Sequence, residues 1–331
     1  MLKYIIRRLL IMIPTLIAIS VISFVIIQLP PGDFVTTYLR DLEAAGGSFG
    51  MPDEAIAEAL RARYGLGQPV YVQYFKWMWR LLHGDMGRSM YYNKQVNVII
   101  AERVPWSAVI SLLSIMFVYS VGIPIGTLSA TYQYSIRDYF FTLVGFIGIA
   151  IPNFLFALIL LWFYFVYTGN VALGLFSREF IMAPWSLARF WDFLKHLWIP
   201  IIVIGTAGTC GLIRIMRANL LDELRKPYVM VARSKGLSER SLLYKYPFRV
   251  ALNPIISTVG WMLPAIVNGE LLASWVLGIP TLAPVFLTSL LQQDMFLAGS
   301  IIMVLSFLTV IGTLISDILL TWTDPRIRES V

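Results

Sequence analysis

The chain has 331 residues, of which 58% are hydrophobic and only 14% are charged, and its formal net charge is +7. This composition lies far outside the balance of soluble globular domains, so the sequence predicts a membrane protein. A single cysteine excludes an intramolecular disulfide, and two distant histidines give no sign of a metal or catalytic site.

The first apolar run follows a basic stub. Residues 9–29 carry no charge, and about twenty apolar residues are enough to cross the hydrocarbon core of a bilayer. A signal peptide would have a shorter apolar core and a small-residue cleavage site, whereas this run ends in Gln28-Leu29-Pro30-Pro31-Gly32. We therefore expect residues 1–30 to form a cytoplasmic stub and an uncleaved first transmembrane helix.

Residues 31–103 are polar and predict an external segment with amphipathic helices. Pro52-Asp53-Glu54 starts a helix that ends at Gly65. A second helix, over residues 71–82, is rich in aromatic side chains, which favour the headgroup level of a membrane. We expect it to lie along the membrane surface; packing in a small outer domain is the alternative.

Residues 104–331 predict a five-helix core. Its apolar runs are 104–130, 139–168, 198 to about 213, 255–277 and 298–320. The run at 139–168 contains Ile151-Pro152-Asn153, an interruption that membrane helices tolerate. The predicted fold class is an all-α polytopic membrane protein with six transmembrane helices.

The positive charge is distributed unevenly. More than half of the 26 basic residues lie in the N-terminal stub, the turn at Arg137, the loop 214–249 and the C-terminal tail. Because cytoplasmic loops carry the excess of Lys and Arg, both termini and the 214–249 loop are expected inside the cell. The membrane topology explains the net charge without a nucleic-acid partner.

The basic loop has clear helix signals. Pro227 can open a short helix and Gly236 can close it in the left-handed conformation, after which Ser238 can cap a second helix. The i, i+3, i+4 spacing brings Val229, Ala232 and Arg233 together. We expect a helix–turn–helix whose small apolar surface, ringed by charge, contacts a protein partner.

The loop from Tyr228 to Ser238 resembles the cytoplasmic EAA loop of binding-protein-dependent ABC importers, in the version of the oligopeptide/dipeptide permease family. The likeness extends over essentially the whole chain. Further motifs occur in the order of that family: Met1-Leu2-Lys3, Arg7-Arg8-Leu9, Pro31-Gly32-Asp33, Tyr64-Gly65-Leu66-Gly67-Gln68-Pro69, Gly84-Asp85-Met86-Gly87-Arg88-Ser89, Ala150-Ile151-Pro152-Asn153-Phe154 and Asp324-Pro325-Arg326-Ile327-Arg328.

The resemblance implies a multi-pass subunit of the inner (cytoplasmic) membrane with type I importer architecture. Its partners would be a second homologous permease, two cytoplasmic ABC ATPases, an external solute-binding protein and the lipid bilayer. This chain would bind no cofactor, because ATP and Mg²⁺ belong to the ATPases; it also lacks a GxxxxGK[ST] phosphate loop and any catalytic constellation.

The resemblance further implies that residues 217–254 form a cytoplasmic coupling loop, whose coupling helix docks on an ATPase. Its expected docking residues are Tyr228, Val229, Ala232, Arg233, Lys235, Gly236 and Leu237. Ala232 and Gly236 match the Ala and Gly of the family, whereas Met230 and Val231 stand where the broader family has Glu and Ala. The acidic residue of the family therefore has no counterpart here.

Polar residues within apolar runs are costly and usually face protein or water. Expected residues of the translocation path are Asn153, Asn268, Glu270 and Ser274. A structural hydrogen bond is an equal alternative for Glu270, and a structural role is favoured for Asp317.

Members of the resembled family import peptides, oligosaccharides or nickel. Peptide is the first expectation for the substrate and oligosaccharide a close second, because residues 274–284 depart from the acidic residue and Pro-Gly-Leu-Gly sequence of peptide-type relatives. The alternative class, an ion-coupled secondary transporter, often has inverted repeats and several intramembrane charges. The sequence shows no convincing repeat.

Overall fold

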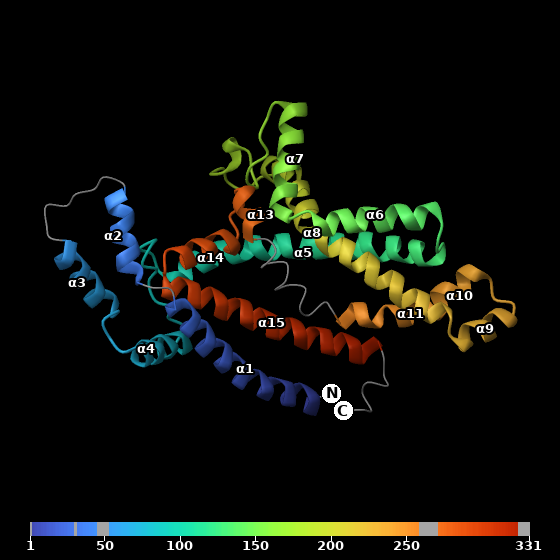
Figure 1. Ribbon diagram of the computed structural model, residues 1–331, viewed down its shortest axis with the longest axis horizontal. Helices are drawn as coiled ribbons and strands as arrows, with labels where there is room; N and C mark the ends of the chain where they lie inside the picture. Colours follow the sequence, from blue (N-terminus) through green and yellow to red (C-terminus); the bar gives the residue numbers. More distant parts are fainter. Residues whose placement is uncertain (1, 30–31, 45–52, 258–270, 324–331) are drawn as a thin grey trace. The chain divides into compact units, whose positions relative to one another are not determined.

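The computed structural model describes residues 2–29, 32–44, 53–257 and 271–323, and these ranges are predominantly helical (Figure 1). The helices are α1 (Leu2–Gln28), α2 (Phe34–Ala44), α3 (Asp53–Tyr64), α4 (Val70–Leu82), α5 (Val96–Thr131), α6 (Ile136–Ala150), α7 (Asn153–Thr168), η1 (Arg178–Phe180), α8 (Leu187–Leu224), α9 (Pro227–Ser234), α10 (Glu239–Lys245), α11 (Pro247–Ala251), α13 (Leu271–Val276), α14 (Leu282–Leu291) and α15 (Met295–Thr323). The expected all-α class is confirmed.

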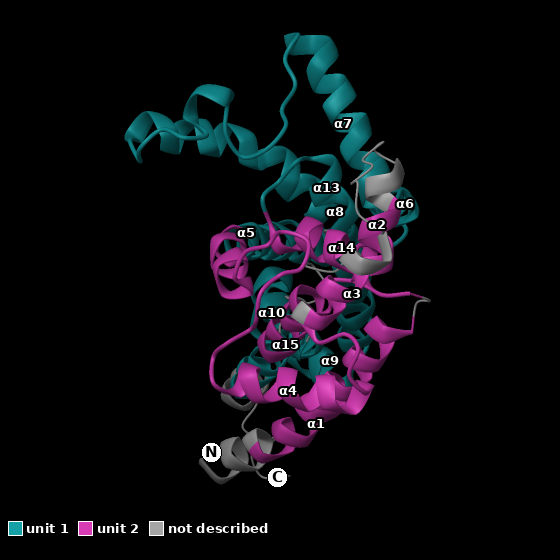
Figure 2. Ribbon diagram, turned by 90° about the vertical axis from the view of Figure 1, so that its left-hand side faces the viewer, with its two compact units in different colours: residues 1–4, 107–280, 309–331 teal, residues 5–106, 281–308 magenta. Residues whose placement is uncertain are grey.

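The chain divides into two compact units (Figure 2). Unit 1 contains residues 1–4, 107–280 and 309–331, and unit 2 contains residues 5–106 and 281–308. Most of α1 and the polar segment after it therefore pack with residues 281–308. The three-part division at residues 30 and 103 stays a prediction.

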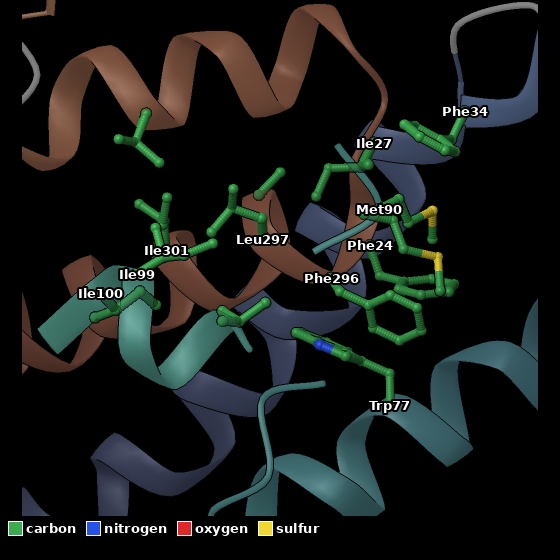
Figure 3. Packing of buried hydrophobic residues seen from close by; sticks show 14 of the residues in the cluster. Phe24, Ile27, Phe34, Trp77, Met90, Ile99, Ile100, Phe296, Leu297 and Ile301 are labelled. Carbon is green, nitrogen blue, oxygen red and sulfur yellow. The ribbon is translucent and has the colours of Figure 1, made fainter. Parts of the chain in front are cut away.

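Unit 2 has a core of aromatic and aliphatic side chains from helices far apart in the sequence. Phe24 of α1, Trp77 of α4, Ile99 of α5 and Leu297 of α15 are all buried in it (Figure 3). Gly299 permits close packing, since a Cβ atom there would lie 3.0 Å from Cζ2 of Trp77. This core fixes α4 against α1 and α15.

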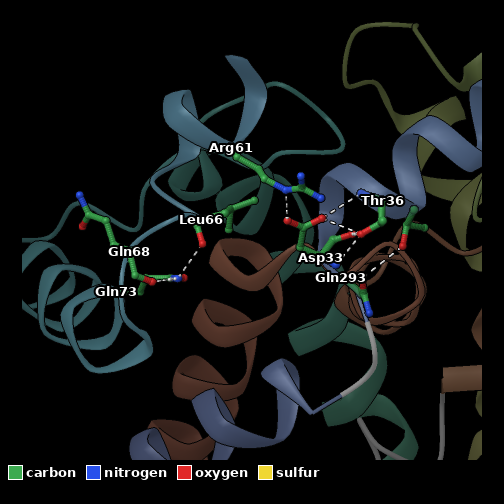
Figure 4. A network of polar contacts seen from close by, with 8 residues as sticks. Asp33, Thr36, Arg61, Leu66, Gln68, Gln73 and Gln293 are labelled. Carbon is green, nitrogen blue, oxygen red and sulfur yellow. Dashed lines mark hydrogen bonds and ion pairs between the residues drawn. The ribbon is translucent and has the colours of Figure 1, made fainter. Parts of the chain in front are cut away.

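A polar network joins the helices that follow α1 (Figure 4). Oδ1 of Asp33 accepts a hydrogen bond from the Thr36 amide at 2.9 Å, and Oδ2 accepts one from Nε of Arg61 at 2.8 Å. Partial burial raises the pKa of Asp33, but these donors lower it by more, so its pKa lies below the usual value. Gln73 donates to the carbonyls of Leu66 and Gln68 and thus fixes the turn before α4.

Unit 1 is built on close contacts at glycines. A Cβ atom at Gly126 of α5 would lie 2.7 Å from Cβ of Met216 and 2.8 Å from the carbonyl oxygen of Ile213, both on α8. Gly122, one turn earlier, faces Leu212 in the same way. Small residues at this spacing let membrane helices approach closely, so α5 and α8 form a tightly packed pair.

The third apolar run, expected as one interrupted span, is a bent pair of helices. The axes of α6 and α7 differ by 104° across Ile151 and Pro152. Proline lacks the N–H that would continue the helix and disfavours helical geometry in the residue before it. Accordingly, Ile151 is extended, with φ −84° and ψ 120°.

Within the described residues, α1, α5, α8 and α15 are long and apolar enough to cross a membrane, and the bent pair α6–α7 is a possible fifth span. The expected run 255–277 falls largely on residues 258–270, outside the described part. The count of six spans therefore stays a prediction.

The fourth run is longer than expected, because α8 extends beyond 198–213 at both ends. The hydroxyl of Ser186 caps its start by accepting from the Arg189 amide at 3.2 Å. Its end is set by Pro227, since Lys226 before it is extended, with ψ 146°. The helices α3 and α4 match the expected ones, whereas α2 and α14 were not anticipated.

Candidate functional site

The basic loop forms the expected helix–turn–helix. Pro227 occupies the first turn of α9, and Gly236 adopts φ +78° just after Lys235 ends the helix. Ser238 precedes α10 with extended geometry, although its hydroxyl makes no capping hydrogen bond. The predicted ends of α9 at Pro227 and Gly236 are confirmed, and α10 starts after Ser238 as expected but without a capping hydrogen bond from its side chain.

The orientation of α9 corrects the expected contact surface. Val229 and Ala232 are 0% and 7% exposed, and they pack with Leu242 of α10 in a small core flanked by Leu237 and Tyr246. The expectation that Val229 and Ala232 present the apolar contact surface is wrong, because α10 covers that face of α9. The i, i+3 spacing identified a buried face but could not show which part of the chain buries it.

The exposed side of α9 carries three apolar or aromatic side chains beside the polar Arg233 and Ser234. Met230 and Val231 are 57% and 56% exposed, and Tyr228 is 38% exposed. The hydroxyl of Tyr228 donates to Oε2 of Glu223 on α8 at 2.5 Å. Partial burial and this carboxylate raise the pKa of Tyr228, which keeps the phenol protonated as a donor. These three side chains form what we call the α9 outer face.

One ion pair closes the turn between α9 and α10. Nε and Nη2 of Arg233 lie 2.6 and 3.0 Å from the two carboxylate oxygens of Glu239. Bidentate geometry of this kind fixes orientation as well as distance. Lys235 is exposed and makes no ion pair within the described residues, so it is the cation of the turn that remains available to a partner.

The loop is fastened to the membrane helices by apolar packing. Leu243 of α10 and Ala251 of α11 are buried together with Met216 and Leu220 of α8, in a cluster that also includes Val118 of α5. Only Arg225 and Lys226 separate α8 from α9. Packing and chain continuity both tie the position of α9 to α8.

An ion pair with a buried carboxylate and a partly exposed guanidinium connects α6 to the same end of α8. Nε and Nη2 of Arg217 donate to the two oxygens of Asp138 at 2.8 Å each, and the hydroxyl of Ser129 and the amide of Tyr134 also donate to Asp138. Asp138 is 2% exposed. The sequence did not reveal this pair, because an acidic residue in the first turn of a helix is ordinary and its partner lies 79 residues away.

Of the expected path residues, Asn153 and Ser274 are described and Asn268 and Glu270 lie outside the described residues. Asn153 is the first residue of α7 and is half-buried. Ser274 on α13 is fully buried, and its hydroxyl has no hydrogen-bond partner in the part of the chain that the structure describes. Because α13 packs against α7 and α8, Asn153 and Ser274 lie on neighbouring helices.

The described residues include no group of three or more His, Cys, Asp or Glu side chains placed to hold a metal ion. The geometry offers a mechanical element: the short helix α9, with its outer face exposed, is linked to the long apolar helix α8 by two residues and by the packing of α10 and α11. Residues 122–329 match the family described as "Binding-protein-dependent transport system inner membrane component", and residues 1–112 match the N-terminal family of the same membrane components. The chain belongs to this family.

Relatives of this permease cover its whole length. It is 36% identical over 333 residues to the oligopeptide transport system permease protein AppB of Bacillus subtilis (strain 168), covering 99% of this chain and 100% of that protein. It is 31% identical over 329 residues to the oligopeptide transport system permease protein OppB of Haemophilus influenzae, with 99% and 100% covered. It is also 31% identical over 358 residues to the inner membrane ABC transporter permease protein YejB of Escherichia coli O157:H7, with 98% of each covered. The chain is a multi-pass ABC transporter permease of the inner membrane.

Proposed function

We propose that this permease is one of two membrane subunits of an ATP-driven peptide importer and that α9 is its coupling helix to a cytoplasmic ATPase. The observation that supports the coupling role most directly is the rigid seat of α9. Its inner face is fixed by Val229 and Ala232 against α10, and its outer face is left apolar and exposed. Peptide is proposed as the substrate because the printed names of full-length relatives specify oligopeptide transport.

The proposed assembly contains a second homologous permease, two ABC ATPases and an external solute-binding protein. ATP and Mg²⁺ are bound by the ATPases and not by this chain. In this proposal six spans put both termini and α9 on the same side of the membrane, and the excess of basic residues there makes that side cytoplasmic. The EAA-type loop supplies docking contacts from the α9 outer face and Lys235.

In the proposed mechanism, closure of the ATPases moves α9. Because α9 is fixed to α8, and α8 is held to α6 by Arg217 and Asp138, the three helices move together. The spans then open the path alternately to the two sides of the membrane. Asn153, Asn268, Glu270 and Ser274 are the proposed lining residues of that path.

The test places a charge on the α9 outer face. Val231→Asp should reduce peptide uptake by about tenfold or more, because an unpaired charge buried in an interface costs several kcal/mol. The matched control is Ile136→Asp, which puts the same charge at the first residue of α6, where the side chain is 88% exposed. The measurements are ATPase co-purification, binding-protein-stimulated ATP hydrolysis and labelled-peptide uptake in reconstituted vesicles.

We expect Val231→Asp to lose ATPase subunits and uptake while Ile136→Asp retains both. Equal behaviour of the two variants would contradict docking through α9. Uptake by the permease without any ATPase subunit would instead indicate an ion-coupled transporter.

A further inference from the structure

A shallow basic groove lies on the two helices that follow α9. It has a volume of about 450 Å³, and its lining residues are Ser238, Arg240, Ser241, Tyr244, Lys245 and Arg249. Three of these side chains are cationic and none is acidic. No residue of α9 is among them, so the groove is separate from the α9 outer face that is proposed to contact an ATPase.

The groove forms where the chain bends between α10 and α11. Proline disfavours helical geometry in the residue before it, and Tyr246, which precedes Pro247, has φ −119° and ψ −81°. The apolar residues of α10, Leu242 and Leu243, are buried, and α11 packs against α8 (Figure 1). The other side chains of α10 are exposed, so its polar side and α11 together line the groove.

The cations of the groove have no anionic partner among the described residues. Apart from a cation–π contact of Lys245, no hydrogen bond or ion pair involves the side chains of Arg240, Lys245 or Arg249 in that part of the chain. Glu239, the acidic residue next to the groove in the sequence, is already held by two nitrogens of Arg233. The positive charge of the groove is therefore available to an anion from outside the described chain.

The donors of the groove match a phosphate group. The planar guanidinium of arginine fits phosphate oxygens, and lysine adds a point charge. The hydroxyls of Ser238 and Ser241 are exposed and make no hydrogen bond within the described residues, so they supply two neutral donors. A cleft lined by charge of one sign also raises the local concentration of counter-ions. A phosphate monoester suits this set of donors, because it presents three acceptor oxygens.

We propose that this groove binds a phosphate monoester group. Arg240 and Arg249 hold the group from two helices, and Lys245 contributes from the end of α10. The group belongs either to a lipid headgroup or to a soluble metabolite, since both present the same oxygens. A ligand that bridges α10 and α11 stabilises their arrangement, and α10 buries the inner face of α9. The site does not depend on what the permease transports.

The test uses the full-length permease with its co-purifying subunits and two probes that carry the same phosphate. Native mass spectrometry measures retention of phosphatidic acid against phosphatidylcholine of the same acyl chains, and calorimetry measures binding of soluble glycerol 3-phosphate. Arg240→Gln combined with Arg249→Gln should weaken binding of the phosphate probe about fivefold or more, since each basic residue contributes measurable attraction. The matched control is Arg137→Gln combined with Arg225→Gln, which removes the same charge from exposed residues that do not line the groove.

The control pair should bind as the wild type does. Loss of phosphatidic acid in the groove pair would assign the phosphate to a lipid, and loss of glycerol 3-phosphate would assign it to a soluble metabolite. Binding of neither probe by the wild type, unchanged binding in the groove pair, or equal loss in the two pairs would overturn the proposal. Loss of ATPase subunits alone would overturn it too, because the groove would then be a protein contact. If the groove pair does not assemble, Ser241→Asp answers the same question, because a negative charge in the groove repels a phosphate while all three cations stay in place.

Discussion

At the scale of single residues, Gly236 shows how a backbone conformation fixes the shape of a docking element. Its φ of +78° lies in the left-handed region, and no other group lies within 4 Å of the Cβ atom that a side chain would add. A substitution there meets no steric neighbour and acts through backbone strain alone. A substitution at Gly236 therefore tests the shape of the turn after α9 without disturbing its packing.

We predict that Gly236→Val uncouples ATP hydrolysis from uptake while leaving the helices inserted. A β-branched residue in the left-handed region is disfavoured by about 1–2 kcal/mol or more, so the turn after α9 should shift. The measurement is binding-protein-stimulated hydrolysis alongside peptide uptake in vesicles. Gly169→Val is the control, because Gly169 has φ +70° and the same open surroundings. A similar loss of coupling in both variants would contradict a specific role of the α9 turn in coupling.

Residue-level prediction from the sequence was successful where local chemistry decides. Pro227 and Gly236 determine the ends of α9 wherever the loop is placed. The burial of Ala232 depends on α10 folding back over α9, and the pairing of Asp138 with Arg217 depends on the whole arrangement of α6 and α8. Neither the burial of Ala232 nor the Asp138–Arg217 pair can be deduced from residue spacing in a single sequence.

At the scale of elements, the glycine contacts of α5 control how closely it approaches α8. A Cβ atom at Gly126 would meet both a side chain and a backbone carbonyl at less than 3 Å, and the carbonyl cannot move without displacing α8. The sequence showed glycines in this run but not which helix they face.

We predict that Gly126→Ala destabilises the permease by about 1–3 kcal/mol, the usual range for overpacking. The check is the thermal unfolding midpoint of the purified protein in detergent. Gly145→Ala on α6 is the matched control, since its added Cβ atom would meet nothing within 4 Å. Alanine there should be neutral or mildly stabilising, as expected from helix propensity. Equal effects of the two substitutions would show that the α5–α8 contact tolerates a wider separation.

The ends of helices divide into predictable and unpredictable cases. Apolar composition identified the core of the runs that the structure describes, but α8 extends well past its apolar part because Ser186 and Pro227 set its limits. Hydropathy also treated 139–168 as one span, since it does not register the direction in which Pro152 turns the chain.

At the scale of the whole molecule, the distribution of basic residues is the basis for predicting which segments lie on each side of the membrane. We predict that Ser238 is cytoplasmic and that Met182, which is 93% exposed in the segment between α7 and α8, is external. Single cysteines are introduced at each position in a Cys210→Ala background and labelled in intact cells with an impermeant maleimide. Residue 182 should be labelled at once and residue 238 only after permeabilisation; the reverse pattern would invert the orientation.

The 104° bend between α6 and α7 limits what can surround the chain at this point. A break in a helix leaves carbonyl oxygens at the end of α6 and amide groups at the start of α7 without their usual partners. Lipid tails offer no hydrogen bonds, so a break at membrane depth is stable only against other protein or against water. The break at Ile151 and Pro152 is therefore a place where a membrane-embedded chain must be hydrated or covered by protein, either by its own neighbouring helices or by another subunit. Asn153 stands at its edge with an amide that can serve either surrounding.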